Sequence, residues 1–403
     1  MPRVRQIMRD ATLMSIRCSA PCFPPVPMPL LSHGEICRKR VKCAACKQSG
    51  QRLASIELSS IQTRNKRLML KPEQQSQIEA AAAILRKGGV VAMPTETVYG
   101  LAADASNPAA VRRIFEIKGR PADHPLIVHL ADESQLGYWA REVPKSAKFL
   151  AKQFWPGPLT LILPRTQHVL DVITGGQDTV GLRVPDHPVA LALLRAMGPN
   201  VALAAPSANR YGRISPTTAQ HVRDELGDSV DMILDGGPCQ VGLESTIVSC
   251  IGDKVSILRP GGIPLAAIEE VLQHKVEVVD SSTASIRVSG SVLSHYAPVT
   301  PLELLPHASL WQRACDLAAQ GLRVATLEWS ASDEVHLTNS TPAHAGIHRS
   351  AMPANPVICG QMLYATLRRL DNEHFDRLLA ETPPQTTEWL AVADRLKRAS
   401  HRD

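Results

Sequence analysis

The chain has 403 residues, of which 44% are hydrophobic and 4% aromatic, so it can form two or three domains with apolar cores. The net charge is +6, but residues 1–70 hold 13 Lys and Arg against 3 Asp and Glu, a net of +10. The remainder holds 31 against 35, a net of −4. A mildly acidic body with few aromatic side chains argues against a broad nucleic-acid-binding face, while allowing a local cationic site for a small polyanion.

Residues 1–70 form a basic leader without sustained hydrophobic periodicity, and we expect this leader to be disordered or dispensable. Two alternatives stay open. The spacings Cys18-x3-Cys22 and Cys43-x2-Cys46 are compatible with a zinc site. An Arg-rich, acid-poor leader is also typical of an organelle transit peptide. The body has four widely spaced cysteines, which is typical of free thiols in a reducing compartment.

The most informative stretch of the sequence runs from residue 94 to residue 129. An apolar run, Val90–Met93, predicts a short buried strand, and Thr95 and Thr97 follow its carboxyl end. Open α/β sheets bind ligands at that end of their strands. Asn107-Pro108 then predicts a helix start, with Asn as the cap and Pro at the first position, and Gly119 predicts the helix end.

Two cations and an imidazole follow in the same stretch. Lys118 and Arg120 leave the end of the predicted helix, and His129 stands at the exit of the next predicted strand. Taken singly, these could be a solvated helix end and a core histidine. Arg183 and Arg259 also stand at strand ends, and together the four cations favour a phosphate-binding site.

Strands and helices alternate through the rest of the chain at the spacing of an α/β fold. Two hairpin-like strand pairs favour a mixed sheet over an all-parallel one. Residues 330–356 show no clear period. Expected helices span residues 72–87, 144–154, 188–197, 217–226, 362–370 and 389–399; expected strands span 159–163, 179–184, 201–204, 232–234, 246–249, 255–258 and 321–327.

Several ordered motifs resemble the Sua5/YrdC family, the threonylcarbamoyl-AMP synthases. Residues 94–129 carry PTETVYGL, KGRP and HPLIVH, and residues 205–209 read APSAN. Residues 243–248 read LESTIV, and residues 259–262 read RPGG. SHYAP at residues 294–298 and the tail resemble the extra domain of the longer, Sua5-type members. The likeness covers residues 71–403, and the ordered set is far more specific than any one motif.

The resemblance implies a domain organisation. Residues 71–280 would form a YrdC-like catalytic domain, a twisted mixed sheet with a cationic concave cleft. Residues 281–298 would be a linker, and residues 299–403 a small Rossmann-like α/β domain that caps the active site. Tyr296 lies in the linker, where the sequence shows no core pattern around it.

The resemblance also implies an activity. Family members condense L-threonine, bicarbonate or CO2, and ATP into threonylcarbamoyl-AMP and pyrophosphate, as nucleotidyltransferases. The product supplies the t6A37 modification of tRNA through a t6A transferase complex, so contact with tRNA would be indirect. Mg2+ would accompany ATP, and the protein would be cytoplasmic with no membrane partner.

The family's site residues can be carried over by motif position. Lys118 and Arg120 would act in catalysis. L-threonine would contact Thr97, His129, Arg183, Ala205 and Ser245. ATP would contact Arg120, His124, Thr179, Ser207, Asn209, Ser215, Arg259 and Tyr296. His124 departs from the Asn common at its position, and residues 289–293 depart from the Ser-Pro-Gly stretch usual in the linker.

Two other functions remain open from the sequence alone. A cationic concave face could bind RNA, as in a ribosome-maturation factor, although the acidic body speaks against that function. A carbamoyl-transferring YrdC-type domain, as in hydrogenase maturation, would share the fold. The upstream sequence shows no acylphosphatase or zinc-finger segments, which counts against the second alternative.

Deleting residues 1–68 tests the interpretation of the leader. We expect activity and melting temperature to stay nearly unchanged, because the leader lacks the apolar pattern of a core. The zinc hypothesis makes the opposite prediction, with stoichiometric zinc in the full-length chain and a lower melting temperature after deletion. Metal analysis and thermal unfolding of both chains distinguish the two.

Overall fold

The computed structural model of the protein describes residues 70–252, 254–280, 285–290, 295–330 and 346–401. Residues 1–69 of the leader lie outside the described residues, together with the candidate zinc ligands Cys18, Cys22, Cys43 and Cys46 and parts of the expected linker. Within the described residues, no helix has the length and apolar character needed to cross a membrane.

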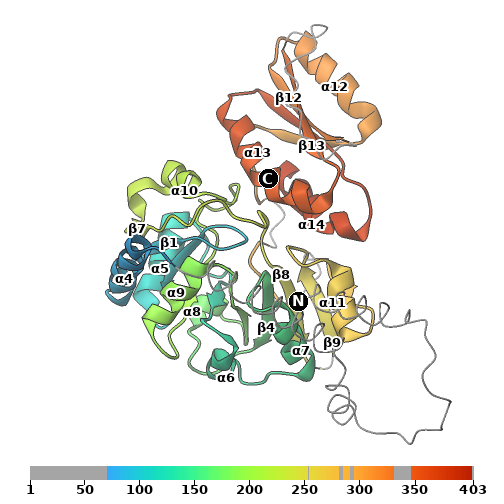
Figure 1. Cartoon of the computed structure of the whole chain (residues 1–403). Coiled ribbons are helices and arrows are strands. Elements are labelled where there is room, and N and C mark those ends of the chain that lie inside the picture. Colours follow the sequence, from blue (N-terminus) through green and yellow to red (C-terminus); the bar gives the residue numbers. More distant parts are fainter. Residues whose placement is uncertain (1–69, 253, 281–284, 291–294, 331–345, 402–403) are drawn as a thin grey trace, which may run out of the picture. The chain divides into compact units, whose positions relative to one another are not determined.

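The larger of the two described sheets is mixed and has ten strands. The strands are β1 (Val91–Met93), β2 (Gly100–Asp104), β3 (Ile127–His129), β4 (Leu159–Pro164), β5 (Thr179–Arg183), β6 (Leu203–Ala204), β7 (Met232–Ile233), β8 (Thr246–Ile251), β9 (Lys254–Arg259) and β10 (Glu277–Val278). Their spatial order is β10-β9-β8-β4-β5-β3-β6-β2-β1-β7. Strands β1, β4, β7, β8 and β9 are labelled in Figure 1. Parallel pairs such as β3–β5 and β4–β8 occur beside antiparallel pairs such as β1–β2 and β8–β9. The expected mixed α/β sheet is confirmed.

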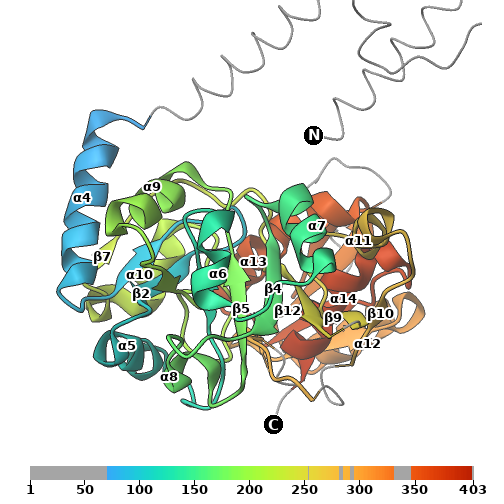
Figure 2. The same ribbon diagram turned by 90° about the horizontal axis from the view of Figure 1, so that it is seen from below.

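Helices cover this sheet according to the period-two alternation of its strands. Val91 and Met93 of β1 pack in the cluster formed with α4 (Pro72–Arg86) and α9 (Pro188–Met197), which lie side by side (Figure 2). Ala92 of β1 packs in the opposite cluster with α5 (Pro108–Lys118). The remaining helices are α6 (Leu136–Trp139), α7 (Lys145–Phe154), α8 (Asp171–Thr174), α10 (Ala219–Leu226) and α11 (Leu265–Leu272), with 3-10 turns η1 (Glu133–Gln135) and η2 (Gly227–Ser229).

Helices α4 and α9 cover only part of their face of the sheet. Farther along this face, Ile127 of β3 and Ile162 of β4 pack with Val288 of the linker. His129 stands two residues after Ile127 on the same strand, so it points to the same face. The face left open by the helices therefore carries the site residues.

The smaller sheet is entirely parallel, in the order β11-β14-β12-β13. Its elements are β11 (Leu302–Leu305), α12 (His307–Ala319), β12 (Val324–Ser330), β13 (Ile347–Pro353), α13 (Pro356–Asn372), β14 (Arg377–Glu381), η3 (Thr387–Trp389) and α14 (Leu390–Ser400). Leu379 packs in a cluster with α12, whereas its neighbours Leu378 and Ala380 pack with α13 and α14. Helices thus cover both faces of this sheet.

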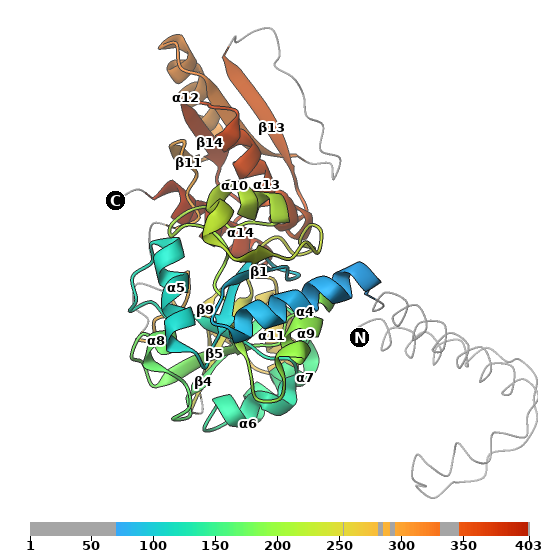
Figure 3. The same cartoon turned by 90° about the vertical axis from the view of Figure 1, so that its left-hand side faces the viewer.

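Several elements of the smaller sheet differ from the sequence expectation. β11, α12 and β14 are not among the expected elements, and two further differences have a clear physical reason. Residues 330–356 show no period, yet Ile347–Pro353 forms β13, the edge strand seen in Figure 3. An edge strand has one neighbour and a weaker burial pattern, which explains the miss. The helix expected over residues 362–370 begins earlier, at Pro356, because the Asn355 carboxamide caps the backbone N–H groups of residues 357 and 358.

The predicted start of α5 is also confirmed and yields a stability test. The Asn107 Oδ1 atom accepts hydrogen bonds from the backbone N–H groups of Ala109 at 3.0 Å and Ala110 at 3.2 Å. Asn107→Ala removes this cap and should lower the free energy of unfolding by about 1 kcal/mol. Asn107→Asp keeps an acceptor and should change it little. Equal urea denaturation midpoints for the two variants would contradict the capping argument.

Candidate active site

A polar pocket lies where several strands of the larger sheet end. β3 and β5 are parallel neighbours, and their last residues, His129 and Arg183, are register partners that both line the pocket. β9 contributes its last residue, Arg259. The lining also includes Thr95, Thr97, Arg120, Ala205, Ser207, Glu244, Ser245, Ser289, Gly290, His295 and Tyr296. Segments far apart in the sequence thus bring the predicted L-threonine residues together with four of the predicted ATP residues, Arg120, Ser207, Arg259 and Tyr296. Their contact with substrates stays a prediction.

The segment after β1 holds the guanidinium group of Arg183. Nη2 of Arg183 donates to a Glu96 carboxylate oxygen at 2.6 Å, and Nη1 donates to the Thr97 hydroxyl at 2.9 Å. The side chains of Arg183 and Glu96 are only 4% and 6% exposed. A buried, charge-assisted contact of this kind fixes the planar guanidinium. Glu96 therefore orients Arg183 without lining the pocket itself.

His129 is buried beside Arg183, and its Nδ1 has no hydrogen-bond partner among the described residues. Burial, reinforced by the positive charge of Arg183, lowers the pKa of His129 to about 3. The imidazole is therefore neutral at neutral pH. A neutral imidazole at this position can make a hydrogen bond to a ligand without adding to the charge of the pocket.

Arg120 and Arg259 differ from Arg183, because within the described chain they donate hydrogen bonds only to neutral oxygens. Arg259 donates to the carbonyls of Ser245 and Ser289 at 2.8 and 2.7 Å, and Arg120 donates to the carbonyl of Pro125 at 3.0 Å. The Nε atom of each arginine has no partner in the described structure. Burial lowers the pKa of Arg120 to about 10, so the group stays cationic at neutral pH. Both cations thus keep donor capacity for an anion.

Lys118 is buried but is not part of the pocket lining. Its ammonium group donates to the backbone carbonyls of Ser207 at 2.6 Å and Asn209 at 2.5 Å. Burial lowers the pKa of Lys118 well below its usual value. The lysine thereby holds the loop after β6, whose residues Ala205 and Ser207 do line the pocket. Contact of Lys118 and Asn209 with phosphate stays a prediction.

Three more predicted ATP contacts lie outside the pocket lining. Nδ1 of His124 is 3.3 Å from the hydroxyl of Tyr211. Thr179 lines a small separate cavity. The Ser215 hydroxyl donates to Glu244 at 2.6 Å. The structure leaves direct contact of these three side chains with ATP as a prediction.

Glu244 is a buried carboxylate with several donors around it. It accepts hydrogen bonds from Ser215, from Nε of Arg395 at 2.7 Å and from the Tyr364 hydroxyl at 2.9 Å. Burial alone would raise the pKa of Glu244, but the charges of Arg395 and Arg259 and the hydrogen bonds hold it at about 2. Tyr364 and Arg395 belong to α13 and α14, so helices of the smaller sheet hold a wall of the pocket.

Tyr296 lies within a core, contrary to the expectation that none surrounds it. The residue is 1% exposed and belongs to the apolar cluster that includes Leu243 and Tyr364. Its ring stacks on Tyr364 with 5.7 Å between centroids. A Cβ added at Gly290 would lie 2.3 Å from the Tyr296 hydroxyl, so the linker backbone passes very close to the ring. This packing could not be predicted from the sequence, because the residues that pack against Tyr296 come from distant segments.

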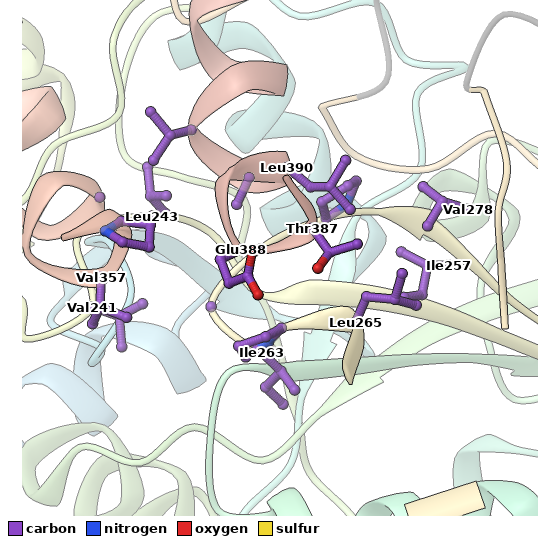
Figure 4. A pocket seen from close by; sticks show the side chains of 18 of the residues that line it. Val241, Leu243, Ile257, Ile263, Leu265, Val278, Val357, Thr387, Glu388 and Leu390 are labelled. Carbon is purple, nitrogen blue, oxygen red and sulfur yellow. The ribbon is translucent and has the colours of Figure 1, made fainter. Parts of the chain in front are cut away.

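The structure contains a second, mostly apolar pocket (Figure 4). Leu243 lines the apolar pocket, whereas its neighbour Glu244 lines the polar one. Val241, Ile257 and Val357 also face the apolar pocket, and Glu388 is its one charged lining residue. Anion chemistry is therefore assigned to the polar pocket. The described residues contain no group of three or more His, Cys, Asp or Glu suited to hold a metal ion.

A mixed α/β sheet with buried arginines at its strand ends is suited to bind an anion. Comparisons with known proteins narrow the class of protein further. Residues 83–261 match the family model Sua5_yciO_yrdC, described as "Telomere recombination". Residues 263–401 match the model "Threonylcarbamoyl-AMP synthase, C-terminal domain". The two matches together cover nearly all of the described chain.

Relatives of similar length agree with the family models. The threonylcarbamoyl-AMP synthase of Bacillus subtilis is 40% identical over 336 residues, which cover 80% of this chain and 93% of the relative. The Schizosaccharomyces pombe threonylcarbamoyl-AMP synthase is 36% identical over 374 residues. A crystal structure of Pyrococcus abyssi Sua5 complexed with L-threonine is 38% identical, with a TM-score of 0.71, and the match covers 81% of this chain and 94% of that one.

The chain therefore belongs to the Sua5/YrdC family of threonylcarbamoyl-AMP synthases, in its two-part, Sua5-type form. The resemblance drawn from the motifs is confirmed. The comparisons do not favour the RNA-binding and carbamoyl-transferring alternatives.

The buried, neutral state of His129 predicts a pH dependence of stability. The pKa of His129 is about 3 in the folded chain and roughly 6.5 when unfolded. The unfolded chain therefore binds a proton first as the pH falls. The stability contributed by the neutral imidazole is present above pH ~6.5 and is lost as the pH falls from there towards 3. The melting temperature of the wild type should fall more steeply in this window than that of His129→Gln; parallel curves would contradict the prediction.

Proposed function

We propose that this protein is an L-threonylcarbamoyladenylate synthase that joins L-threonine, bicarbonate or CO2, and ATP into threonylcarbamoyl-AMP and pyrophosphate. It is thus a nucleotidyltransferase, and its product serves the t6A37 modification of tRNA. The observation that carries the proposal is the polar pocket, in which Arg120, Arg183 and Arg259 are buried among hydroxyl groups. One end of such a pocket suits a carboxylate, and the remainder suits a phosphate chain.

L-threonine is assigned to the part of the pocket around Arg183. The fixed guanidinium would pair with the amino-acid carboxylate, and Thr97 would donate or accept a hydrogen bond beside it. His129, as a neutral imidazole, would contact the substrate without repelling its ammonium form. The backbone of Ala205 and the hydroxyl of Ser245 would complete the contacts.

ATP is assigned to the part around Arg120 and Arg259, whose donors are not taken by carboxylates. Ser207 and Tyr296 also line this pocket. The proposed ATP set further includes His124, Thr179, Asn209 and Ser215, which would contact the nucleotide after local rearrangement or support the residues that do. Lys118 would support catalysis indirectly, because its ammonium group holds the loop of residues 205–209 through two backbone carbonyls.

The reaction follows from these groups. The ammonium group of threonine first loses a proton to water. The resulting neutral amine attacks the carbon of CO2 and gives up a second proton to water, which forms an N-carboxylate. An oxygen of that carboxylate then attacks the α-phosphorus of ATP, and the bond to the pyrophosphate oxygen breaks. Negative charge develops on the α-phosphate and the leaving group, so fixed cations such as Arg120 and Arg259 stabilise the transition state. No covalent enzyme intermediate is required.

Other components of the reaction come with the substrates or follow it. Mg2+ would enter as the Mg–ATP complex, since the described residues offer no cluster of acidic ligands for a resident ion. A t6A transferase complex would accept the product, and tRNA would be an indirect partner. We also propose a cytoplasmic location, where ATP, free threonine and tRNA are present.

One assay tests the proposal directly. The full-length protein is incubated with L-threonine, bicarbonate and ATP, and pyrophosphate and threonylcarbamoyl-AMP are measured by enzymatic coupling and mass spectrometry. Pyrophosphate release that requires both threonine and bicarbonate is the expected result. ATP turnover that is independent of threonine, with no adenylate formed, would refute the proposal.

Arg120→Ala provides the sharpest single-residue test of the ATP assignment. Loss of a buried, charge-assisted donor to phosphate should cost roughly 1.5–3 kcal/mol or more of binding or transition-state energy. Arg113→Ala is a matched control, because Arg113 contacts Asp231 and the Gly88 carbonyl and lies outside the pocket. Equal kcat/KM values for ATP in wild type and Arg120→Ala would remove Arg120 from the site.

A further inference from the structure

Arg395, a residue of α14 in the smaller sheet, has a completely buried side chain beside the polar pocket. It does not line that pocket. Its contacts nevertheless reach two residues that line the pocket, Glu244 and Tyr296, and also Pro260, which directly follows the lining residue Arg259. No motif of the family resemblance includes this residue.

The first two contacts join the two loops at one end of the β8–β9 hairpin. Nε of Arg395 donates to the Glu244 carboxylate at 2.7 Å, just before β8. Nη2 of Arg395 donates to the carbonyl of Pro260 at 3.0 Å, just after β9. One guanidinium group therefore bridges the chain entering the hairpin and the chain leaving it. A planar fork with several donors suits this geometry, whereas an ammonium group does not.

The two loops bridged by Arg395 also contact each other closely. The backbone N–H of Gly262 donates to the carbonyl of Glu244 at 3.0 Å. A Cβ added at Gly261 would lie 2.4 Å from that same carbonyl oxygen, so the backbones touch. The loops carry Ser245 and Arg259, which line the polar pocket and are themselves joined by a hydrogen bond of 2.8 Å. A shift of either loop would move both residues.

The third contact involves the linker. The guanidinium carbon of Arg395 lies 5.1 Å from the centroid of the Tyr296 ring, the geometry of a cation–π contact. Tyr296 also lines the pocket, and a Cβ added at Gly290 of the linker would lie 2.3 Å from its hydroxyl. Arg395 thus contacts both the hairpin loops and Tyr296 of the linker.

We propose that Arg395 is a positioning residue of the active site: it fixes Ser245 and Arg259 through Glu244 and Pro260, and it fixes Tyr296 through its ring. The smaller sheet then serves as a fixed support of the pocket in addition to any capping role. The kinetic part of this inference rests on the proposed function, whereas its structural part does not.

The test compares four full-length chains: wild type, Arg395→Lys, Arg395→Met and Arg349→Lys. Arg395→Lys keeps a positive charge beside Glu244, so this variant should fold even if Arg395→Met does not. Arg349→Lys is the matched control, because Arg349 makes a two-pronged contact with Glu328 within the smaller sheet and lies outside the polar pocket. Thermal unfolding establishes which chains are folded.

Two readouts are then measured on the folded chains. The KM values for L-threonine and ATP should rise by about tenfold or more in Arg395→Lys, with a smaller change in kcat. This result is expected because Ser245, Arg259 and Tyr296, which are proposed to bind the substrates, would no longer be held in position. Hydrogen exchange at the Gly262 amide should become faster in Arg395→Lys. Arg349→Lys should resemble the wild type in both readouts.

Each outcome decides the inference. Wild-type KM values and wild-type Gly262 exchange in a folded Arg395→Lys chain would overturn it, as would equal losses in Arg349→Lys. A fall in kcat alone, with unchanged exchange, would also overturn it. If the wild type makes no threonylcarbamoyl-AMP, the proposed function fails, and the exchange comparison alone decides whether Arg395 holds the loops.

Discussion

The structure depends on burying several guanidinium groups around one pocket. Burying a charge is costly unless it is hydrogen-bonded or paired, so each of these groups constrains the chain that surrounds it. Arg183 is paired with Glu96, and Arg395 with Glu244. The fold therefore provides Arg183 and Arg395 each with a carboxylate partner. In doing so, it brings together segments that are far apart in the sequence.

Arg120 and Arg259 have hydrogen-bond partners of a different kind, and this difference leaves positive charge in the pocket. Arg120 and Arg259 donate to carbonyl and hydroxyl oxygens in the described structure and have no carboxylate hydrogen-bond partner there. Neutral acceptors reduce the cost of burial without cancelling the charge. Two net positive charges thus remain in a site of low dielectric, where an anionic ligand is attracted more strongly than in water. Arg183, whose charge is balanced by Glu96, suits the single carboxylate of an amino acid. Arg120 and Arg259, which have no carboxylate partner in the described structure, suit the higher negative charge of a phosphate chain.

Much of this could be predicted from the sequence, because many determinants are local. The helix from Pro108 to Lys118 was bounded by its cap and its glycine, and the strand before Thr95 was defined by an apolar run. Ordered motifs identified the family and pointed to Arg120, His129, Arg183 and Arg259, which the structure brings into one pocket. The positions of Lys118 and Ser215 outside the pocket lining could not be predicted, because their hydrogen-bond acceptors come from other segments. Lys118 donates to two backbone carbonyls and Ser215 to a carboxylate.

The missed features are those that depend on long-range contacts. Nothing near residue 395 distinguishes its arginine from Arg398, since both lie on one amphipathic helix among charged neighbours. Only the fold places Arg395 at the end of the β8–β9 hairpin, where it has acceptors from two loops at once. The same holds for Tyr296, whose core is assembled from α13, α14 and the loop before β8. A buried ion pair of this kind favours one relative placement of the two sheets, because any other placement would separate Glu244 from Arg395 and Tyr364.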